Sequence, residues 1–371
     1  MKKLKKILGT ALFFIVCFFA GGLMGIGMSR GDFSFFELIF ALFVGYNISI
    51  IIHEGGHLVF GLLSGYGFSS FRVWSLMLLK VEGRFSLRTY KLAGTGGQCL
   101  MTPPEGDDRE APVILYNLGG VIFNLILSLV CICVFLAFPN VYLLSCTLIT
   151  TAILSALTLL TNGIPLNIGG IANDGMNALS LTKDRDAKVA FLNQLRMNEA
   201  QTRGIRLCDM PESWFEIPEG VDRKNTAFSS MAVFAVNRSF DKKDMKLSEG
   251  KIEELLNSDW NIIGLHRNLL KCDLAFCKLI NYGREADVSP LQTPEMQNFM
   301  KSMKNFPSVI RTEYAMALIH DNSDAEAEKK LMQFEKIAKT SPHPADIASE
   351  REFIDMAKSK AESIRIMTSE G

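Results

Sequence analysis

Three polar side chains stand close together within a long apolar stretch of this 371-residue chain: His53, Glu54 and His57. On an α-helix, residues four positions apart lie on the same face, about one turn from each other. Both imidazoles can then bind one metal ion, and Glu54 can reach a water molecule on that ion. This pattern is typical of zinc hydrolases, in which the glutamate is the general base. The sequence therefore predicts Zn²⁺ ligands at His53 and His57 and a catalytic role for Glu54.

A polar cluster that only packs helices together is the alternative for this turn. Ionisable groups near the centre of a membrane cost on the order of 2.5–3.5 kcal/mol each on insertion scales. Three polar groups in one turn therefore need a compensating partner, and a zinc ion is such a partner. Gly55 and Gly56, between the histidines, are poor helix formers, but their small size lets another helix or a peptide approach closely.

Apolar residues are concentrated in the first 165 positions, where four hydrophobic runs occur. The runs are about 7–28, 35–63, 112–138 and 141–160. Each is long enough to cross a hydrocarbon core of about 30 Å as a helix. The first run also resembles a signal peptide, but it is long for one. We therefore expect a mainly α-helical, polytopic membrane bundle with about four spans.

The positive-inside rule predicts how these spans are oriented. Lysines at the start of the chain place the N-terminus in the cytoplasm, and four spans return the chain to that side. At 1.5 Å per residue, His53 lies roughly 25 Å from the outer end of its helix, so the metal site falls in the cytoplasmic half of the membrane. We thus expect a multi-pass cell-membrane protein of bacterial origin, with both termini in the cytoplasm.

Residues 64–112 interrupt the apolar pattern. Two short runs typical of β-strands, at 68–81 and 84–92, are joined at Glu82-Gly83, which predicts a small β-hairpin. The glycines of residues 94–97 do not have a phosphate-binding spacing, so a turn is expected there. Basic residues also place this segment in the cytoplasm. They are Arg72, Lys80, Arg84, Arg88 and Lys91.

Charge and cysteine content exclude some classes of partner and site. The 39 Lys and Arg residues balance the 39 Asp and Glu residues, so nothing suggests a nucleic-acid partner. The eight cysteines include no Cys-x-x-Cys pair, so we expect neither a cysteine zinc site nor a disulfide framework.

The sequence predicts two domains: a transmembrane metalloprotease domain at residues 1–183 and a soluble helical domain at 184–371. In the second domain, amphipathic helices at 312–319 and 325–339 are followed by Pro342. This arrangement resembles a tetratricopeptide unit. A generic helical bundle is the alternative. In either case the domain is a candidate site for a protein partner.

A catalytic zinc site needs a third protein ligand, and Asp174 is the best remaining candidate. It is the first acidic residue after the fourth run and comes at the same membrane level as the two histidines. The chain from Asn162 to Gly175 contains a proline and several glycines that interrupt the helix. The alternative is that Asp174 is a turn residue, because Asn-Asp-Gly is a strong turn sequence.

With these motifs the chain resembles the site-2 protease family of intramembrane zinc metalloproteases over about residues 35–182. The matching motifs are the His53 to His57 turn, Gly120-x-x-x-Asn124, and Asn162-x-x-Pro165 leading to Asp174-Gly175. The resemblance implies that His53, His57 and Asp174 bind zinc and that Glu54 is the general base. It also implies that Asn162 and Asn124 contact the substrate, and that the hairpin lines up an extended substrate.

The chain departs from the family pattern in four respects, one of which is that the family's second proline is missing. Asn173 stands where the family usually has leucine or methionine, and the stretch from Asn162 to Asp174 is longer than usual. No PDZ domain is visible, and the helical region takes its place.

The sequence therefore predicts an intramembrane zinc metalloprotease. Its substrate is expected to be a membrane protein or membrane peptide, cleaved in or next to a transmembrane segment. Two other hypotheses stay open: a membrane-anchored zinc protease that cuts soluble segments, and a non-catalytic membrane scaffold whose helical domain binds partners.

Overall fold

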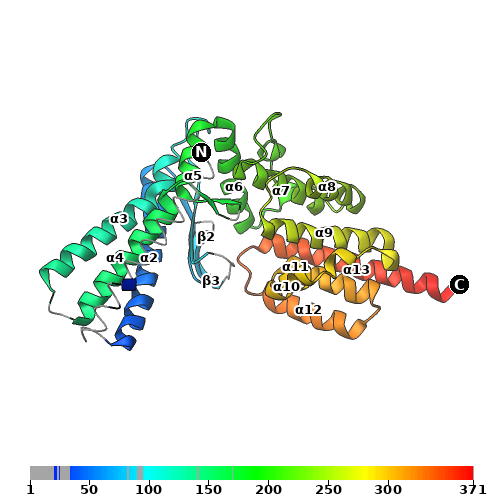
Figure 1. Ribbon diagram of the computed structural model, residues 1–371. Coiled ribbons are helices and arrows are strands. Elements are labelled where there is room, and N and C mark those ends of the chain that lie inside the picture. Colours follow the sequence, from blue (N-terminus) through cyan, green and yellow to red (C-terminus); the bar gives the residue numbers. More distant parts are fainter. Residues whose placement is uncertain are drawn as a thin grey trace. The chain divides into compact units, whose positions relative to one another are not determined.

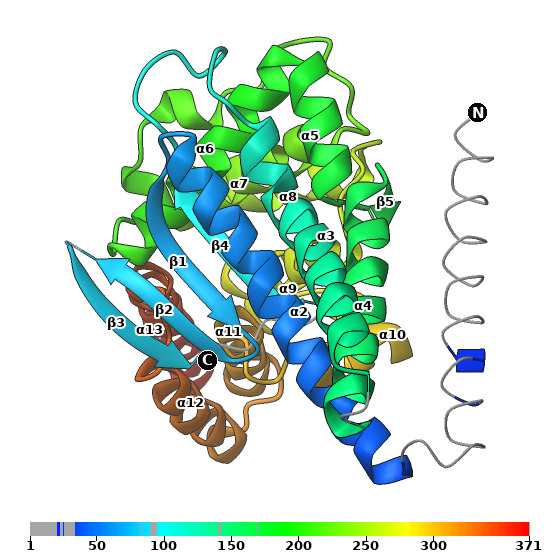
Figure 2. The ribbon, with the colours of Figure 1, turned by 90° about the vertical axis from the view of Figure 1, so that its left-hand side faces the viewer.

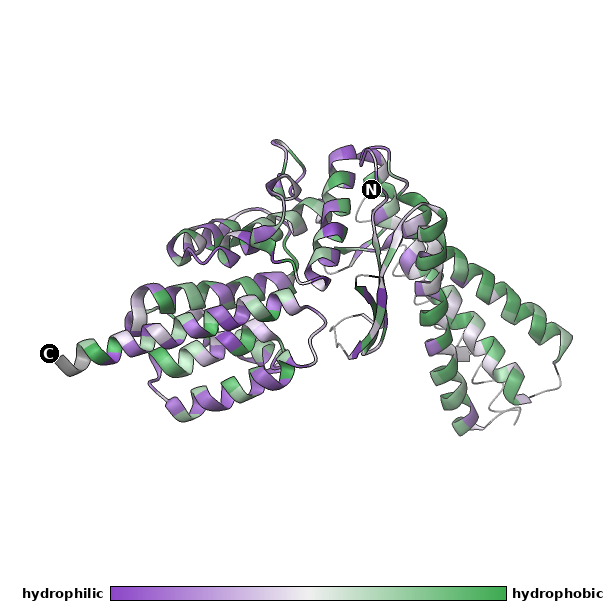
Figure 3. Cartoon of the chain, turned by 180° about the vertical axis from the view of Figure 1, so that it is seen from behind, coloured by the Kyte–Doolittle hydropathy of each residue, from purple (hydrophilic) through white to green (hydrophobic). Residues whose placement is uncertain are grey.

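Three long apolar helices form the first part of the fold: α2 (Phe35–Leu63), α3 (Ile114–Ala137) and α4 (Tyr142–Gly163). The structure is a computed structural model and describes residues 21, 22, 25, 34–81, 83–89, 95–139, 142–168 and 170–370. All three helices are long and apolar enough to cross a membrane (Figure 3). The mainly α-helical membrane fold is thereby confirmed. The run at about 7–28, predicted as a further span, lies outside the described residues apart from three positions.

Helix α2 begins at a local sequence signal. At the start of α2, the Ser34 hydroxyl accepts a hydrogen bond from the backbone of Glu37, and the Glu37 carboxylate accepts one from the Ser34 backbone. This capping box satisfies backbone donors that the helix leaves free.

Helices α2, α3 and α4 pack side by side (Figure 2).

A small antiparallel sheet follows α2 and is larger than the predicted hairpin. Its strands are β1 (Gly67–Val73), β2 (Leu76–Val81), β3 (Arg84–Thr89) and β4 (Gly97–Thr102), in the order β3-β2-β1-β4. The run predicted as one strand is divided between β1 and β2 by a turn at Trp74, which has a φ of 55°. The segment after the predicted turn pairs with β1, with Val73 opposite Gly97 and Gly67 opposite Thr102.

Helix α4 extends to Gly163, three residues beyond the predicted run. Two short strands follow, β5 (Asn167–Ile168) and β6 (Ile171–Ala172), which pair as a hairpin. Helix α5 (Asp174–Lys183) begins directly after it. The irregular stretch from α4 to α5 therefore ends at the residue that the sequence predicts as the third ligand.

The rest of the chain is helical. The complete chain divides into two compact units. The first consists of residues 1–80 and 91–189, and the second of residues 81–90 and 190–371. Figure 1 labels the long helices of the second part. The helices are α6 (Arg185–Thr202), α7 (Thr226–Asp241), α8 (Met245–Asn257), α9 (Gly264–Tyr282), α10 (Pro294–Ser302), α11 (Pro307–Ala315), α12 (Asp324–Ala338) and α13 (Pro344–Glu370). A π-helical turn (Met316–His320) follows α11.

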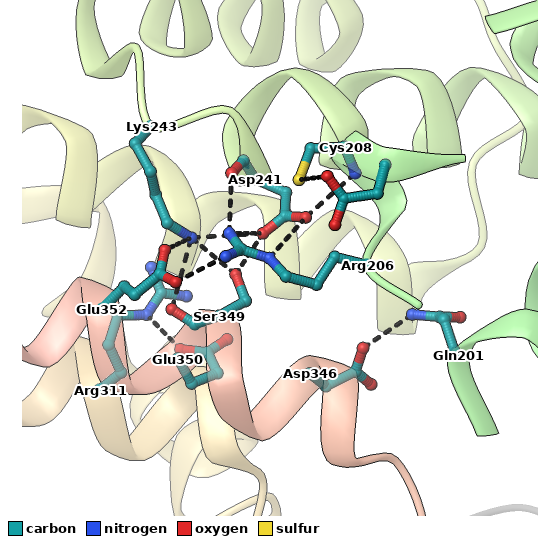
Figure 4. A network of polar contacts seen from close by, with 11 residues as sticks. Gln201, Arg206, Cys208, Asp241, Lys243, Arg311, Asp346, Ser349, Glu350 and Glu352 are labelled. Atoms are coloured by element: carbon teal, nitrogen blue, oxygen red, sulfur yellow. Dashed lines mark hydrogen bonds and ion pairs between the residues drawn. The ribbon is translucent and has the colours of Figure 1, made fainter. Parts of the chain in front are cut away.

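The second unit is held together by buried charges as well as by apolar packing. Arg311 is fully buried, pairs with Asp273, and has its Nε 3.0 Å from Glu350 Oε2. Arg206 lies 2.8 Å from Asp241 and 2.6 Å from Glu352 in the adjoining network (Figure 4). Because most of these charges are paired, the network is compatible with a folded core.

Candidate metal centre

Helix α2 places both histidines of the motif on one face. It is continuous through residues 53–57, so the helical repeat brings the two imidazoles together. The Nε2 atoms of His53 and His57 are 3.3 Å apart. His53, Glu54 and His57 are all buried, each about 8% exposed, so the polar turn points into the protein and away from lipid.

Asp174 is brought to the same point by α5, of which it is the first residue. Its Oδ2 atom lies 3.1 Å from His53 Nε2 and 3.4 Å from His57 Nε2. One ligand atom from each of these residues lies within 4.8 Å of the others. The three side chains predicted as metal ligands therefore converge, although Asp174 is more than 110 residues from the histidines in sequence.

The spacing of the three donor atoms fits a tetrahedral zinc ion. Ligands at about 2.0–2.1 Å from Zn²⁺ in a tetrahedral site are about 3.3–3.4 Å from one another. The measured separations are 3.1, 3.3 and 3.4 Å. In addition, Asp174 Oδ2 is buried and accepts no hydrogen bond of good geometry. A metal ion among the three atoms would satisfy this oxygen, so the residues present fit the group.

The remaining nitrogen of each imidazole is fixed by a hydrogen bond. His57 Nδ1 lies 2.8 Å from the carbonyl oxygen of Tyr116, which can only accept a proton. His53 Nδ1 lies 2.7 Å from Asn124 Oδ1, while Asn124 Nδ2 donates to the backbone and hydroxyl oxygens of Ser49. Both Nδ1 atoms therefore carry the proton, and both Nε2 lone pairs face Asp174. This is the tautomer that a metal ligand requires.

Glycines let α2 and α3 approach closely enough for this arrangement. A Cβ added at Gly56 would lie 2.2 Å from the carbonyl oxygen of Gly119, and one added at Gly119 would lie 2.4 Å from that of Gly56. A Cβ at Gly120 would lie 2.7 Å from His57 Nε2. Any side chain at these positions would push α3 away from the histidines.

Adjacent glycines of the motif therefore have different roles, and this gives a matched test. We expect Gly56→Ala to destabilise the protein by about 1–3 kcal/mol, as overpacking of a close contact does. Gly55→Ala should leave stability unchanged or raise it by up to about 1 kcal/mol, because a Cβ there meets nothing within 4 Å and alanine is the better helix former. Thermal unfolding of both variants in detergent measures the difference. Equal unfolding temperatures would contradict the proposed close approach.

Glu54 extends toward the sheet, where its carboxylate lies against the start of β4. A Cβ at Gly97 would lie 2.5 Å from Glu54 Oε1. The fully buried Arg72 of β1 holds this part of the chain, donating hydrogen bonds to the carbonyl oxygens of Trp74 (2.7 Å), Thr95 (3.4 Å) and Gly97 (3.3 Å). The general-base candidate is thus enclosed between α2 and β4.

The two predicted substrate contacts occupy different positions. Asn124 is fully buried, with its amide bonded to His53 and Ser49, as described above. Asn162 lies in the last turn of α4, half-buried, and donates to the carbonyl oxygen of Thr158 at 3.2 Å. Contact with substrate at either residue stays a prediction.

Cys99 lies on β4, the strand that Glu54 contacts, and it is buried. Burial raises the pKa of its thiol well above the usual value. The group is therefore a neutral thiol, whereas a nucleophile or zinc ligand would be a thiolate.

Sequence reasoning missed the residues that orient the site. The carbonyl of Tyr116 acts through its backbone, so its residue type gives no signal. Nothing in the sequence indicates that Arg72 is buried. In the sequence Asn173 stands out only as a departure from a family pattern, yet its side chain accepts a hydrogen bond from Met176 and caps α5. The Asn-Asp-Gly sequence was the available signal.

Comparison with known families finds a match over most of the chain. The family described as Peptidase family M50 matches residues 40–343, which include most of α2, all of α3 and α4, the sheet and much of the helical region. Among curated proteins and among solved structures, no match is found.

Proposed function

The chain belongs to peptidase family M50, and we propose that it is an intramembrane zinc metalloprotease. The family implies a metalloprotease associated with membranes. The convergence of His53, His57 and Asp174 in zinc-like geometry, next to the buried Glu54, carries the proposal. Because two ligands lie on a helix that can cross a membrane, the substrate is a membrane protein or membrane peptide cut in or next to a transmembrane segment.

His53 Nε2, His57 Nε2 and Asp174 Oδ2 would hold the zinc ion. When bound, zinc would supply a Lewis acid for the peptide carbonyl and lower the pKa of a water ligand toward about 7. Glu54 accepts the proton of the attacking water and then donates it to the leaving amine nitrogen. Asn124 and the Tyr116 carbonyl keep the imidazoles oriented throughout. The burial of Glu54 excludes bulk water from this proton transfer.

A transmembrane substrate must lose its helical structure before it is cut. In a helix each peptide carbonyl accepts a hydrogen bond and is covered by its own turn. β4 begins at Gly97, against Glu54, so a substrate segment extended along this sheet would bring a peptide bond to the base. The small sheet thus supports the proposal that the substrate binds in extended form.

We also propose an orientation of the chain in the membrane. The basic residues of the segment between the first two described spans favour a cytoplasmic location for the site and for both termini. The helical unit would then recognise a substrate or a regulatory protein on that side.

The test uses the full chain purified in detergent and reconstituted with a panel of single-span peptides. We expect cleavage in or next to the apolar segment, its loss on treatment with a zinc chelator, and its return with added zinc. Cleavage confined to soluble segments would favour the membrane-anchored protease instead. A protein that binds no zinc and cuts nothing would favour the non-catalytic scaffold.

A further inference from the structure

Asn173 directly precedes Asp174, and its side chain makes four hydrogen bonds. Its Nδ2 donates to the carbonyl oxygens of Thr161 and Ile164, both at 2.6 Å. Its Oδ1 accepts from the backbone nitrogens of Leu166 at 3.1 Å and Met176 at 2.9 Å. The amide therefore uses both of its protons and both of its acceptor positions.

These bonds join the end of one helix to the start of another. Thr161 belongs to the last turn of α4, whose final carbonyls have no partner within the helix. Met176 belongs to the first turn of α5, where the backbone N–H groups are also free, and Asn173 is the N-cap there. One side chain thus caps both ends and closes the irregular segment between them.

The junction that Asn173 closes is tightly packed. A Cβ added at Gly175 would lie 2.2 Å from the carbonyl oxygen of Gly163, so α5 starts in direct contact with the end of α4. The Asn173 backbone also donates to the Leu166 carbonyl oxygen at 3.1 Å. The next residue, Asp174, has little freedom to move once these contacts are made.

We propose that Asn173 is a positioning residue that sets the affinity and geometry of the metal site by fixing Asp174. The inference rests on the proposed zinc site, since it concerns the placement of the third ligand. Asp174 enters the site from a short helix outside the spans that carry the histidines. Something must therefore hold it at 3.1 to 3.4 Å from both Nε2 atoms, and the Asn173 amide is the group placed to do so.

Substitutions of Asn173 can separate the bonds that its Nδ2 donates at the end of α4 from the bond that its Oδ1 accepts at the start of α5. Asn173→Leu has a similar size and removes all four. Asn173→Ser keeps a cap for α5 but is too short to donate to both carbonyls at the end of α4. Residues that orient metal ligands typically change metal affinity by 10–100-fold when replaced. We expect a loss in that range for Asn173→Leu and about 10-fold for Asn173→Ser.

The experiment measures zinc affinity of the full-length protein in detergent by competition with a chromophoric chelator. Cobalt-substituted protein gives a second readout, because its visible spectrum reports the number and geometry of ligands. Asn177→Leu is the matched control: it is the same change on the same helix, at a side chain with no hydrogen bond among the described residues. We expect its zinc affinity to stay within about twofold of the original.

Thermal unfolding of the metal-free variants distinguishes positioning from a purely structural role. If Asn173 only supported the fold, its variants would unfold at lower temperature yet bind zinc as the original chain does, with an unchanged cobalt spectrum. That result in either the Leu or the Ser variant would overturn the proposal. Failure of the original chain itself to bind zinc would instead refute the proposed function, so the two failures are distinguishable.

Discussion

Glu54→Gln is expected to abolish peptide hydrolysis while zinc stays bound. Glutamine has the size of glutamate, but it cannot accept the proton of the attacking water. General acid–base catalysis contributes about 10²–10⁴-fold, so the rate should fall by at least that factor. Because His53, His57 and Asp174 are unchanged, zinc content should remain close to one ion per chain. Cleavage of a membrane peptide and metal analysis of the same preparation measure both effects.

The control for this variant is Glu37→Gln on the same helix. Glu37 belongs to the capping box at the start of α2, a role that glutamine can also fill. Its activity should match that of the original chain. If Glu54→Gln retained cleavage at a comparable rate, Glu54 would not be the general base.

Asp174→Ala is expected to remove both zinc and activity. The substitution leaves only two protein ligands, His53 and His57, where a catalytic zinc normally has three. Loss of a direct ligand should weaken zinc binding by more than the 10–100-fold that is typical when a residue hydrogen-bonded to a ligand is replaced. Chelator competition measures the affinity, and a cleavage assay with excess zinc shows whether the weakened site can be refilled.

A surface aspartate nearby provides the comparison. Asp186 is partly exposed, and its carboxylate lies 3.5 Å from Arg109 in a surface ion pair. Such pairs contribute little to stability, so Asp186→Ala should bind zinc normally. Stoichiometric, tight zinc binding by Asp174→Ala would mean that another group is the third ligand.

The membrane helices could be predicted from the sequence because their signals are local. The run predicted at 35–63 coincides with α2, and the later two runs differ from α3 and α4 by a few residues at the ends. Length and apolar composition alone identify such helices. The sheet was predicted less completely, because β4 depends on pairing with β1, about 30 residues earlier. The reversal at Trp74 needs a positive φ that its residue type does not indicate.

The candidate site divides in the same way. His53, Glu54 and His57 could be predicted from one helical repeat. Asp174 could be predicted as the third ligand from its position after the fourth run, and the resemblance to a known family implies the same role. The contacts that hold them could not be predicted. The resemblance names Asn124 as a substrate contact, whereas its contact with His53 joins residues 71 positions apart. The contact of Glu54 with Gly97 likewise depends on how β4 packs against α2. Packing between distant segments decides these details, and a single sequence does not encode them in any local pattern.

The central claim is that His53, His57 and Asp174 bind a catalytic zinc ion. Anomalous diffraction at the zinc absorption edge, from crystals of the zinc-loaded full-length protein, tests it most directly. We predict one strong peak about 2.0–2.1 Å from each histidine Nε2 and about 2.0–2.2 Å from an Asp174 oxygen. A peak bound by other residues, or no peak at the two histidines in protein loaded with zinc, would contradict the account.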